Sequence, residues 1–197
     1  APMDPLAMLS EIRSNLSMFK TSFDLAYINI FLPDEHMASS ESLYFFPMSK
    51  LSDFQIPKEV LENPGTSSVW FYQDLLSVPF LVNNSYHITN SVSCCRVLKH
   101  PDTDSIKYAY IIYLDASEFS SILQEIFQDN QITSYILTDN GKIVASNNPS
   151  LLSASLDEEK LDFLYNKGDS LKKRDHTNYH TTTLRNGWLQ VTEIPDS

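Results

Sequence analysis

His176 and His180 are the two side chains in this sequence whose spacing could hold a metal ion. On a helix, side chains four residues apart lie on one face and can bind one ion together. The residues around this pair are rich in threonine and indicate a strand instead. Along a strand, four residues separate two imidazoles by about 13 Å, which is too far for a shared ion. We therefore expect no metal site here.

The other reactive side chains also have structural explanations. The carboxylates of Asp157, Glu158 and Glu159 come where a helix is expected to begin, and negative charge suits that end of the helix dipole. Cys94 and Cys95 are adjacent on an expected strand and should point to opposite faces, as free thiols rather than a disulfide. The sequence has neither a GxSxG motif nor a glycine-rich phosphate loop. It favours a binding module with no cofactor over an enzyme, and a hydrolase of another class is a third alternative.

The bulk composition limits the classes of partner. The 197 residues carry a formal net charge of −11 at pH 7, and 42% of them are hydrophobic. Nucleic acid and anionic lipid require a cationic surface, so neither is expected as a direct partner. No apolar run reaches the ~18 residues that a membrane-spanning helix requires. The length fits one large domain or two small ones, and the chain could be the water-soluble part of a membrane protein.

Two stretches of sequence indicate a repeated module. In residues 132–148 an apolar run leads to the sequence DNG at 139–141, and a second apolar run follows. Asn-Gly favours a type I′ hairpin turn, because both residues tolerate a positive φ. A looser copy, residues 28–40, is expected to turn at Asp34, 105 residues before Asp139. We interpret the pair as one small α+β module that is used twice.

Residues 6–23 are predicted to form a long amphipathic helix that follows Asp4-Pro5. Its apolar positions are spaced alternately by three and four residues, as on one face of a helix. They are Leu9, Ile12, Leu16, Phe19 and Phe23. Such a face can dock on a sheet, or it can pair with the same helix of a second subunit in a parallel dimer.

The rest of the chain is expected to alternate helices with groups of strands, which is typical of an α+β fold. Helices are predicted at 56–63 and after two capping-box sequences that begin at Asp115 and Ser155. Residues 172–175 are predicted to form a polar turn, and the boundary between the modules is expected near Asn130. The predicted strands are 27–32, 43–47, 69–72, 78–82, 88–98, 106–114, 180–184 and 188–194.

Four segments give the chain a family resemblance. They are YILTDNGKIVAS at 135–146, NGWLQVTEIP at 186–195, IIYLDASEFSSIL at 111–123 and GTSSVWFY at 65–72. Together they resemble the double Cache (dCache) sensor domain of bacterial transmembrane receptors. The nearest subgroup is that of YesM-type sensor histidine kinases.

The resemblance implies a fold and a location. The fold would be a long N-terminal helix, residues 1–25, followed by two PAS-like modules, each with a central antiparallel sheet flanked by helices. The membrane-distal module would span 26–130 and the membrane-proximal module 131–197. The fragment would lie outside the cell between two membrane spans, and the kinase part of the receptor would lie elsewhere in the protein. Receptors with AraC-type outputs and chemoreceptors are alternatives, as is an interaction domain that binds a protein partner.

The resemblance also implies a ligand site in the distal module. By position, the expected ligand-binding residues are Trp70, Tyr72, Arg96, Tyr110 and Asp115. Aromatic rings would supply apolar faces with a polar group, and the two charged side chains would recognise charged groups or hydroxyls.

The chain departs from its amino-acid-binding relatives in that module. Those relatives carry an arginine two residues before the tryptophan, and Ser68 stands there in this chain. Phe71 and Asn63 replace tyrosines. Free amino acids are therefore not the expected ligands, while a sugar, a peptide, another metabolite or a protein partner stays open.

Overall fold

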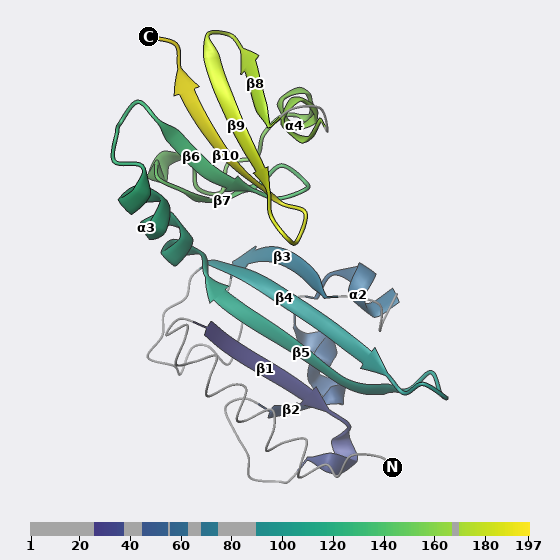
Figure 1. The fold of residues 1–197 in the computed structure, drawn as a ribbon. Helices are drawn as coiled ribbons and strands as arrows, with labels where there is room; N and C mark the ends of the chain where they lie inside the picture. Colours follow the sequence, from purple (N-terminus) through teal and green to yellow (C-terminus); the bar gives the residue numbers. More distant parts are fainter. Residues whose placement is uncertain (1–25, 38–44, 55, 63–67, 75–89, 167–169) are drawn as a thin grey trace. The chain divides into compact units, whose positions relative to one another are not determined.

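The computed structural model describes residues 26–37, 45–54, 56–62, 68–74, 90–166 and 170–197 (Figure 1). By its internal contacts the chain divides into two units, Ala1–Asp115 and Ala116–Ser197. The predicted N-terminal helix (residues 1–25) and the predicted strand 78–82 lie outside the described residues.

The first unit holds a five-stranded sheet in the order β2-β1-β5-β4-β3. Its strands are β1 (Ala26–Leu32), β2 (Phe45–Pro47), β3 (Val69–Asp74), β4 (Asn90–Lys99) and β5 (Ile106–Asp115). Across the sheet, each neighbouring pair in the order β1, β5, β4, β3 is antiparallel. The edge strand β2 pairs parallel with β1. The expected antiparallel sheet is therefore found for β1, β3, β4 and β5, and the parallel pairing of the edge strand β2 was not predicted.

The predicted hairpin at residues 28–40 is also different in the structure. After β1, Asp34–His36 form a single 3-10 turn, η1, and Met37 lies outside any strand. Residues 38–40, which were expected to return, lie outside the described part. The described neighbour of β1 at this edge is the parallel strand β2. Without an Asn-Gly pair after β1, the sequence lacks the residues that make a tight hairpin turn easy.

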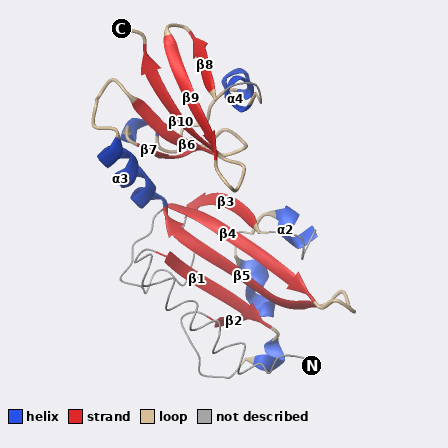
Figure 2. Cartoon of the chain, viewed as in Figure 1, coloured by secondary structure: helices blue, strands red, loops and turns tan. Residues whose placement is uncertain are grey.

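The second unit holds a five-stranded sheet in the order β7-β6-β10-β9-β8 (Figure 2). Its strands are β6 (Thr133–Leu137), β7 (Ile143–Ser146), β8 (Leu171–Arg174), β9 (Thr177–Thr183) and β10 (Leu189–Pro195), and all neighbours pair antiparallel. Numbered within each unit, both sheets have the order 2-1-5-4-3. This shared order supports the interpretation of the chain as one module that is used twice.

The hairpin predicted at residues 132–148 is confirmed as β6 and β7. Its turn is not the predicted type I′, because Asn140 has no positive φ and only Gly141 does, at 86°. The backbone N–H of Gly141 donates to the carbonyl of Thr138 at 3.0 Å, and the N–H of Thr138 donates to the carbonyl of Lys142 at 2.9 Å. A five-residue loop of this kind requires one residue in the left-handed region, and glycine takes that conformation without strain.

Three α-helices occur among the described residues. α2 (Lys58–Glu62) is shorter than the predicted helix 56–63, and α3 (Ala116–Ile126) begins directly after Asp115, as expected. α4 (Glu158–Tyr165) is capped by Asp157, whose Oδ1 accepts from the N–H of Lys160 at 2.8 Å. The cap predicted at Ser155 is wrong, because Ser155 is held in a β-bridge with Lys142.

Helix α3 belongs to the second unit. It contacts β7 and β6, so the chain divides at Asp115 rather than near Asn130. The predicted polar turn at 172–175 is also different: Leu171–Arg174 form the edge strand β8, and the turn falls at Asp175 and His176. Lysines on a sheet edge resist pairing with other chains, which explains a strand of such polar composition.

Candidate functional site

The two faces of the first sheet differ in what they contact. Alternate strand residues face the 3-10 helix η2 (Met48–Asp53) and α2, and we name this side the helix-side face. Its apolar half forms a core with Leu51, Phe54 and Val60 from those helices. The strand residues of that core are Phe31, Cys95, Val97, Ala109, Ile111 and Tyr113. The opposite side, which we name the back face, carries a smaller cluster around Ile30, Leu32 and Phe45.

The helix-side face becomes polar toward the start of β4 and the end of β5. We define the polar cluster as Asn29, Gln73, Ser91, Ser93 and Tyr113, which come from four neighbouring strands. All five residues are buried, and Asn29, Ser91 and Ser93 are 0% exposed. Buried polar groups in a sheet are costly unless they are hydrogen-bonded, so five of them together need an explanation.

Hydrogen bonds link the polar cluster in two groups. Asn29 Nδ2 donates to the hydroxyl oxygen of Tyr113 at 3.0 Å. Gln73 Nε2 donates to Ser93 Oγ at 2.8 Å, and the hydroxyls of Ser91 and Ser93 lie 2.9 Å apart. These bonds fix the orientation of each side chain on the face.

One acceptor of the polar cluster is unpaired. Asn29 Oδ1 is buried and accepts no hydrogen bond from the part of the chain that the structure describes. Turning the amide over would let Oδ1 accept from the Tyr113 hydroxyl, but Nδ2 would then lose its acceptor, so one polar atom of Asn29 stays unpaired in either orientation. A buried carbonyl oxygen without a donor destabilises the fold by about 1–3 kcal/mol, so its retention indicates a role in binding.

The predicted ligand-binding residues are divided between the two faces. Asp115 is the register partner of Ser91 and therefore lies on the helix-side face, next to the polar cluster. The other four lie on the back face by register: Trp70 opposite Cys94, Tyr72 opposite Val92, and Arg96 opposite Tyr110. The structure thus brings Arg96 and Tyr110 together and separates both from Asp115 by the thickness of the sheet.

The back-face residues have their own chemistry. Arg96 Nε is buried and makes no hydrogen bond within the described residues. Beside it, burial raises the pKa of the Cys94 thiol above its ordinary value. Burial raises the pKa of Cys95, on the helix-side face, to about 12. Both cysteines are free, as predicted, and the structure buries both of them. Burial keeps the thiols protonated at neutral pH, so they are poor nucleophiles.

The sequence analysis did not single out Asn29, Gln73, Ser91 or Ser93. A usable signal was present in the alternation of the strands. Asn29 interrupts the apolar run of β1, and Ser91 and Ser93 lie two residues apart in β4, so they share one face. Polar residues in phase on otherwise apolar strands predict a polar stripe on a buried face.

On the corresponding face of the second sheet the central polar groups are paired. Tyr135, on β6, donates its hydroxyl to Glu193 Oε1 at 2.8 Å, and Lys160 of α4 lies 2.9 Å from the same oxygen. Burial first, and then the Glu193 charge, raise the pKa of Tyr135 above its ordinary range. Leu164 of α4, 1% exposed, completes the core on this face. Here each polar group has a partner.

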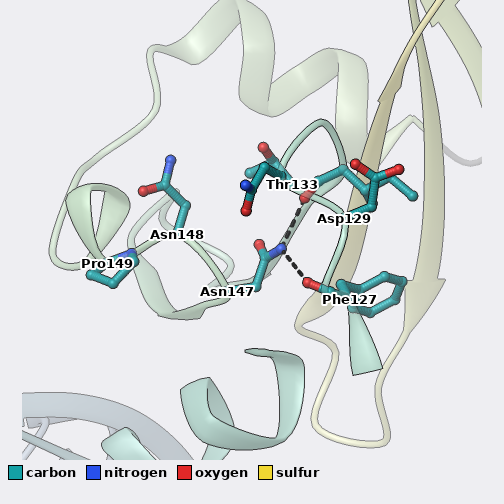
Figure 3. Close-up of a pocket in the computed structure, with 8 residues that line it drawn as sticks. Phe127, Asp129, Thr133, Asn147, Asn148 and Pro149 are labelled. Atoms are coloured by element: carbon teal, nitrogen blue, oxygen red, sulfur yellow. Dashed lines mark hydrogen bonds between the residues drawn. The ribbon is translucent and has the colours of Figure 1, made fainter. Parts of the chain in front are cut away.

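A shallow pocket of about 310 Å³ lies at the end of α3, in the second unit (Figure 3). Asn147 occupies its floor and donates from Nδ2 to the carbonyls of Phe127 and Ile132, at 3.2 and 2.8 Å. Its Oδ1 accepts from the N–H of Ser134, and Asp129 Oδ1 accepts from the N–H of Gln131. Asn147 and Asp129 hold the turn between α3 and β6, so we assign these two side chains a structural role.

Comparison with known proteins gives a likeness in fold. No protein-family model and no curated protein matches the sequence. Among solved structures, the extracellular domain of rpHK1S-Z16, a protein assigned as a histidine kinase, aligns with a TM-score of 0.56 and 11% identity over 91% of this chain and 74% of its own. The ligand-binding domain of the Pseudomonas aeruginosa PAO1 chemoreceptor PctC, in complex with GABA, aligns with a TM-score of 0.55 and 11% identity, over 98% of this chain and 83% of its own.

The periplasmic sensory domain of the Campylobacter jejuni chemoreceptor Tlp1 is a third such structure. It aligns with a TM-score of 0.55 and 11% identity, over 93% of this chain and 78% of its own. The first is an extracellular domain, the second a ligand-binding domain and the third a periplasmic sensory domain, and the alignments cover both units of this chain. At this identity the likeness concerns the fold alone. It agrees with the expected pair of PAS-like modules.

Two further properties concern the described residues only. None of their helices is both long and apolar enough to cross a membrane. No group of three or more histidine, cysteine, aspartate or glutamate side chains within them could hold a metal ion.

Proposed function

We propose that this chain is the extracellular ligand-sensing domain of a transmembrane signal-transduction receptor, and that the first unit binds the ligand. The observation that carries the proposal is the polar cluster, with the unpaired Asn29 Oδ1 on its β1 side. The match of both units to extracellular and periplasmic sensor domains supports it. The second unit, whose corresponding face is closed by Tyr135, Glu193 and Lys160, would transmit the signal.

The connection between the units gives the signal a covalent route. Tyr113 and Asp115 lie on β5, and α3 begins at the next residue, Ala116. α3 packs on β7, where the N–H of Ser146 donates to Ser120 Oγ at 3.1 Å. A ligand that favours one arrangement of the end of β5 would bias α3 and the second sheet, and only this difference in binding energy between two arrangements can drive a response.

We further propose the receptor class. The segments quoted above favour a two-component sensor histidine kinase of the YesM type, with its catalytic part outside this fragment. A receptor with an AraC-type output and a chemoreceptor are the alternatives, and PctC and Tlp1 are structural neighbours of the latter kind. The chain would lie outside the cell between membrane spans, and its residues 1–25 would pair with a second copy in a homodimer.

A thermal-shift screen of a broad metabolite library tests the proposal. A ligand that binds only the folded state raises the melting temperature, by an amount that grows with its concentration. We expect at least one compound class to raise the Tm of the wild-type chain and to have a smaller effect on an Asn29→Leu variant. If no compound in a broad library shifts the Tm, direct sensing of a small molecule is contradicted.

A second candidate function is an interaction domain that binds a protein partner and no small ligand. One observation favours it: Ile122 and Ile126 on α3 are 52% and 64% exposed, four residues apart on one side of the helix. A double Ile122→Ser, Ile126→Ser variant separates the two functions in the receptor. It should abolish signalling by a protein partner and leave the thermal response to a small ligand unchanged.

A further inference from the structure

The polar half of the helix-side face of the first sheet has neutral and acidic hydrogen-bonding side chains but no basic ones among its described strand residues. Its polar half, from Asn29 and Ile111 to Asp115, contains one carboxylate, two amides, two serine hydroxyls and one tyrosine hydroxyl among the strand residues whose side chains the structure describes. No lysine or arginine lies among those strand residues. The arginine of these strands, Arg96, lies on the back face.

The unpaired atom has one chemical requirement. Asn29 Oδ1 is a carbonyl oxygen, which accepts hydrogen bonds and donates none. Its own amide nitrogen is already used, since Nδ2 donates to Tyr113. A carboxylate or phosphate placed against Oδ1 would meet a second acceptor, and no lysine or arginine lies among the described strand residues of the polar half to balance its charge.

We propose that the polar cluster binds a ligand group that donates hydrogen bonds and carries no negative charge, an ammonium group in particular, and that Asn29 Oδ1 is its acceptor. The inference rests on the proposed function, since it assigns the ligand class of the same site. Asp115 lies on this face at the same end of the sheet, as the register partner of Ser91. The assignment differs from the sequence-based expectation, which gave Arg96 a part in ligand recognition.

Three compounds of equal chain length test the ligand class. They are 1,4-diaminobutane, 1,4-butanediol and succinate, each added to the wild-type chain in a thermal-shift and a calorimetric titration. We expect the diamine to raise the Tm and to give a measurable Kd, the diol to act in the same direction but more weakly, and succinate to have no effect. The inference is overturned if the diamine neither raises the Tm nor binds measurably. It is also overturned if succinate raises the Tm as much as the diamine does.

Substitutions at Asn29 locate the binding. Asn29→Leu removes the acceptor at similar volume and should weaken diamine binding by about tenfold or more, since a hydrogen bond to a charged group is lost. Asn29→Asp keeps an acceptor oxygen and adds negative charge, so it should retain or strengthen diamine binding. Asn178→Leu, the same exchange on the second sheet, is the matched control and should bind as the wild type does. Equal binding by wild type and Asn29→Leu would overturn the assignment of Oδ1.

The ligand class and the sensing function fail in different ways. If an anionic compound from the metabolite library raises the Tm of the wild type but not that of Asn29→Leu, the proposed ligand class is overturned. The first unit would still be the sensor. A library in which no compound responds would contradict both.

Discussion

The two sheets of this molecule share one strand order, but they differ in whether the polar side chains on their helix-facing sides are paired. In the second sheet Glu193 accepts hydrogen bonds from Tyr135 and from Lys160 of α4, so these three polar groups are paired. In the first sheet the equivalent side is half apolar core and half polar cluster, and Asn29 Oδ1 has no described partner. When a fold is repeated in one chain, one copy can have its polar groups paired and serve as a structural support. The other copy can keep a polar atom without a hydrogen-bond partner. We take the second condition as the mark of the binding copy.

The apolar halves of the two sheets should be equivalent, and large-to-small substitutions test this with the largest effects. Leu164→Ala and Leu51→Ala remove side chains that are 1% and 6% exposed. Each should lower the free energy of unfolding of its own unit by about 3 kcal/mol, through lost transfer energy and a residual cavity. Urea unfolding can follow the units separately, because Trp70 lies in the first and Trp188 in the second.

Leu152→Ala is the control for this pair, since Leu152 is 41% exposed and should change stability little. A loss confined to one of the two buried positions would show that the cores are not equivalent. The comparison of the polar halves would then need revision.

Alkaline pH should affect the first unit before the second. The pKa of Cys95 rises from 9.0 to about 12 on folding, because burial disfavours the thiolate. The folded state keeps a proton that the unfolded state releases, so this contribution is full below pH 9 and is lost as the pH rises toward 12, by about 1.4 kcal/mol per pH unit. In the second unit the pKa values of Tyr135 and Tyr165 are raised above 10, so their contribution to stability begins to fall only above about pH 10.

Urea midpoints between pH 8 and pH 10.5 measure this difference. Cys95→Ala should flatten the pH dependence reported by Trp70 and leave that reported by Trp188 unchanged. A Cys95→Ala chain with the wild-type pH dependence would contradict the burial of this thiol as the cause.

The polar halves should differ in how much stability they lose when a side-chain hydrogen bond is removed. Tyr135→Phe removes a bond to a charged acceptor and should destabilise the second unit by about 1.5 kcal/mol. Asn29→Leu also removes one bond, to Tyr113, but it relieves an unpaired buried oxygen. The net change in the first unit should be small, between a loss and a gain of about 1 kcal/mol. A loss as large as that of Tyr135→Phe would indicate that Asn29 is a structural residue.

The sequence predicted the fold better than the site, for physical reasons. Period-two strands, the Asn-Gly hairpin and the start of α3 after Asp115 depend on local residues, and they were found. The parallel pairing of β2 and the strand β8 depend on contacts distant in sequence, and they were not. The predicted site residues were divided between two faces because the face of a residue depends on register, which a resemblance by position does not supply. Asp115 alone lies beside the polar cluster.

Hydrogen exchange of the wild-type chain, with and without 1,4-diaminobutane, tests most directly whether the first unit is the sensor. Peptides from β1, β4 and β5 report on the polar cluster, and peptides from β6, β9 and β10 report on the closed sheet. The account predicts that the diamine slows exchange in β1, β4 and β5 and that any change in the second sheet is smaller. Slower exchange confined to β6, β9 and β10 would contradict it, because the ligand would then bind the copy that we interpret as a support.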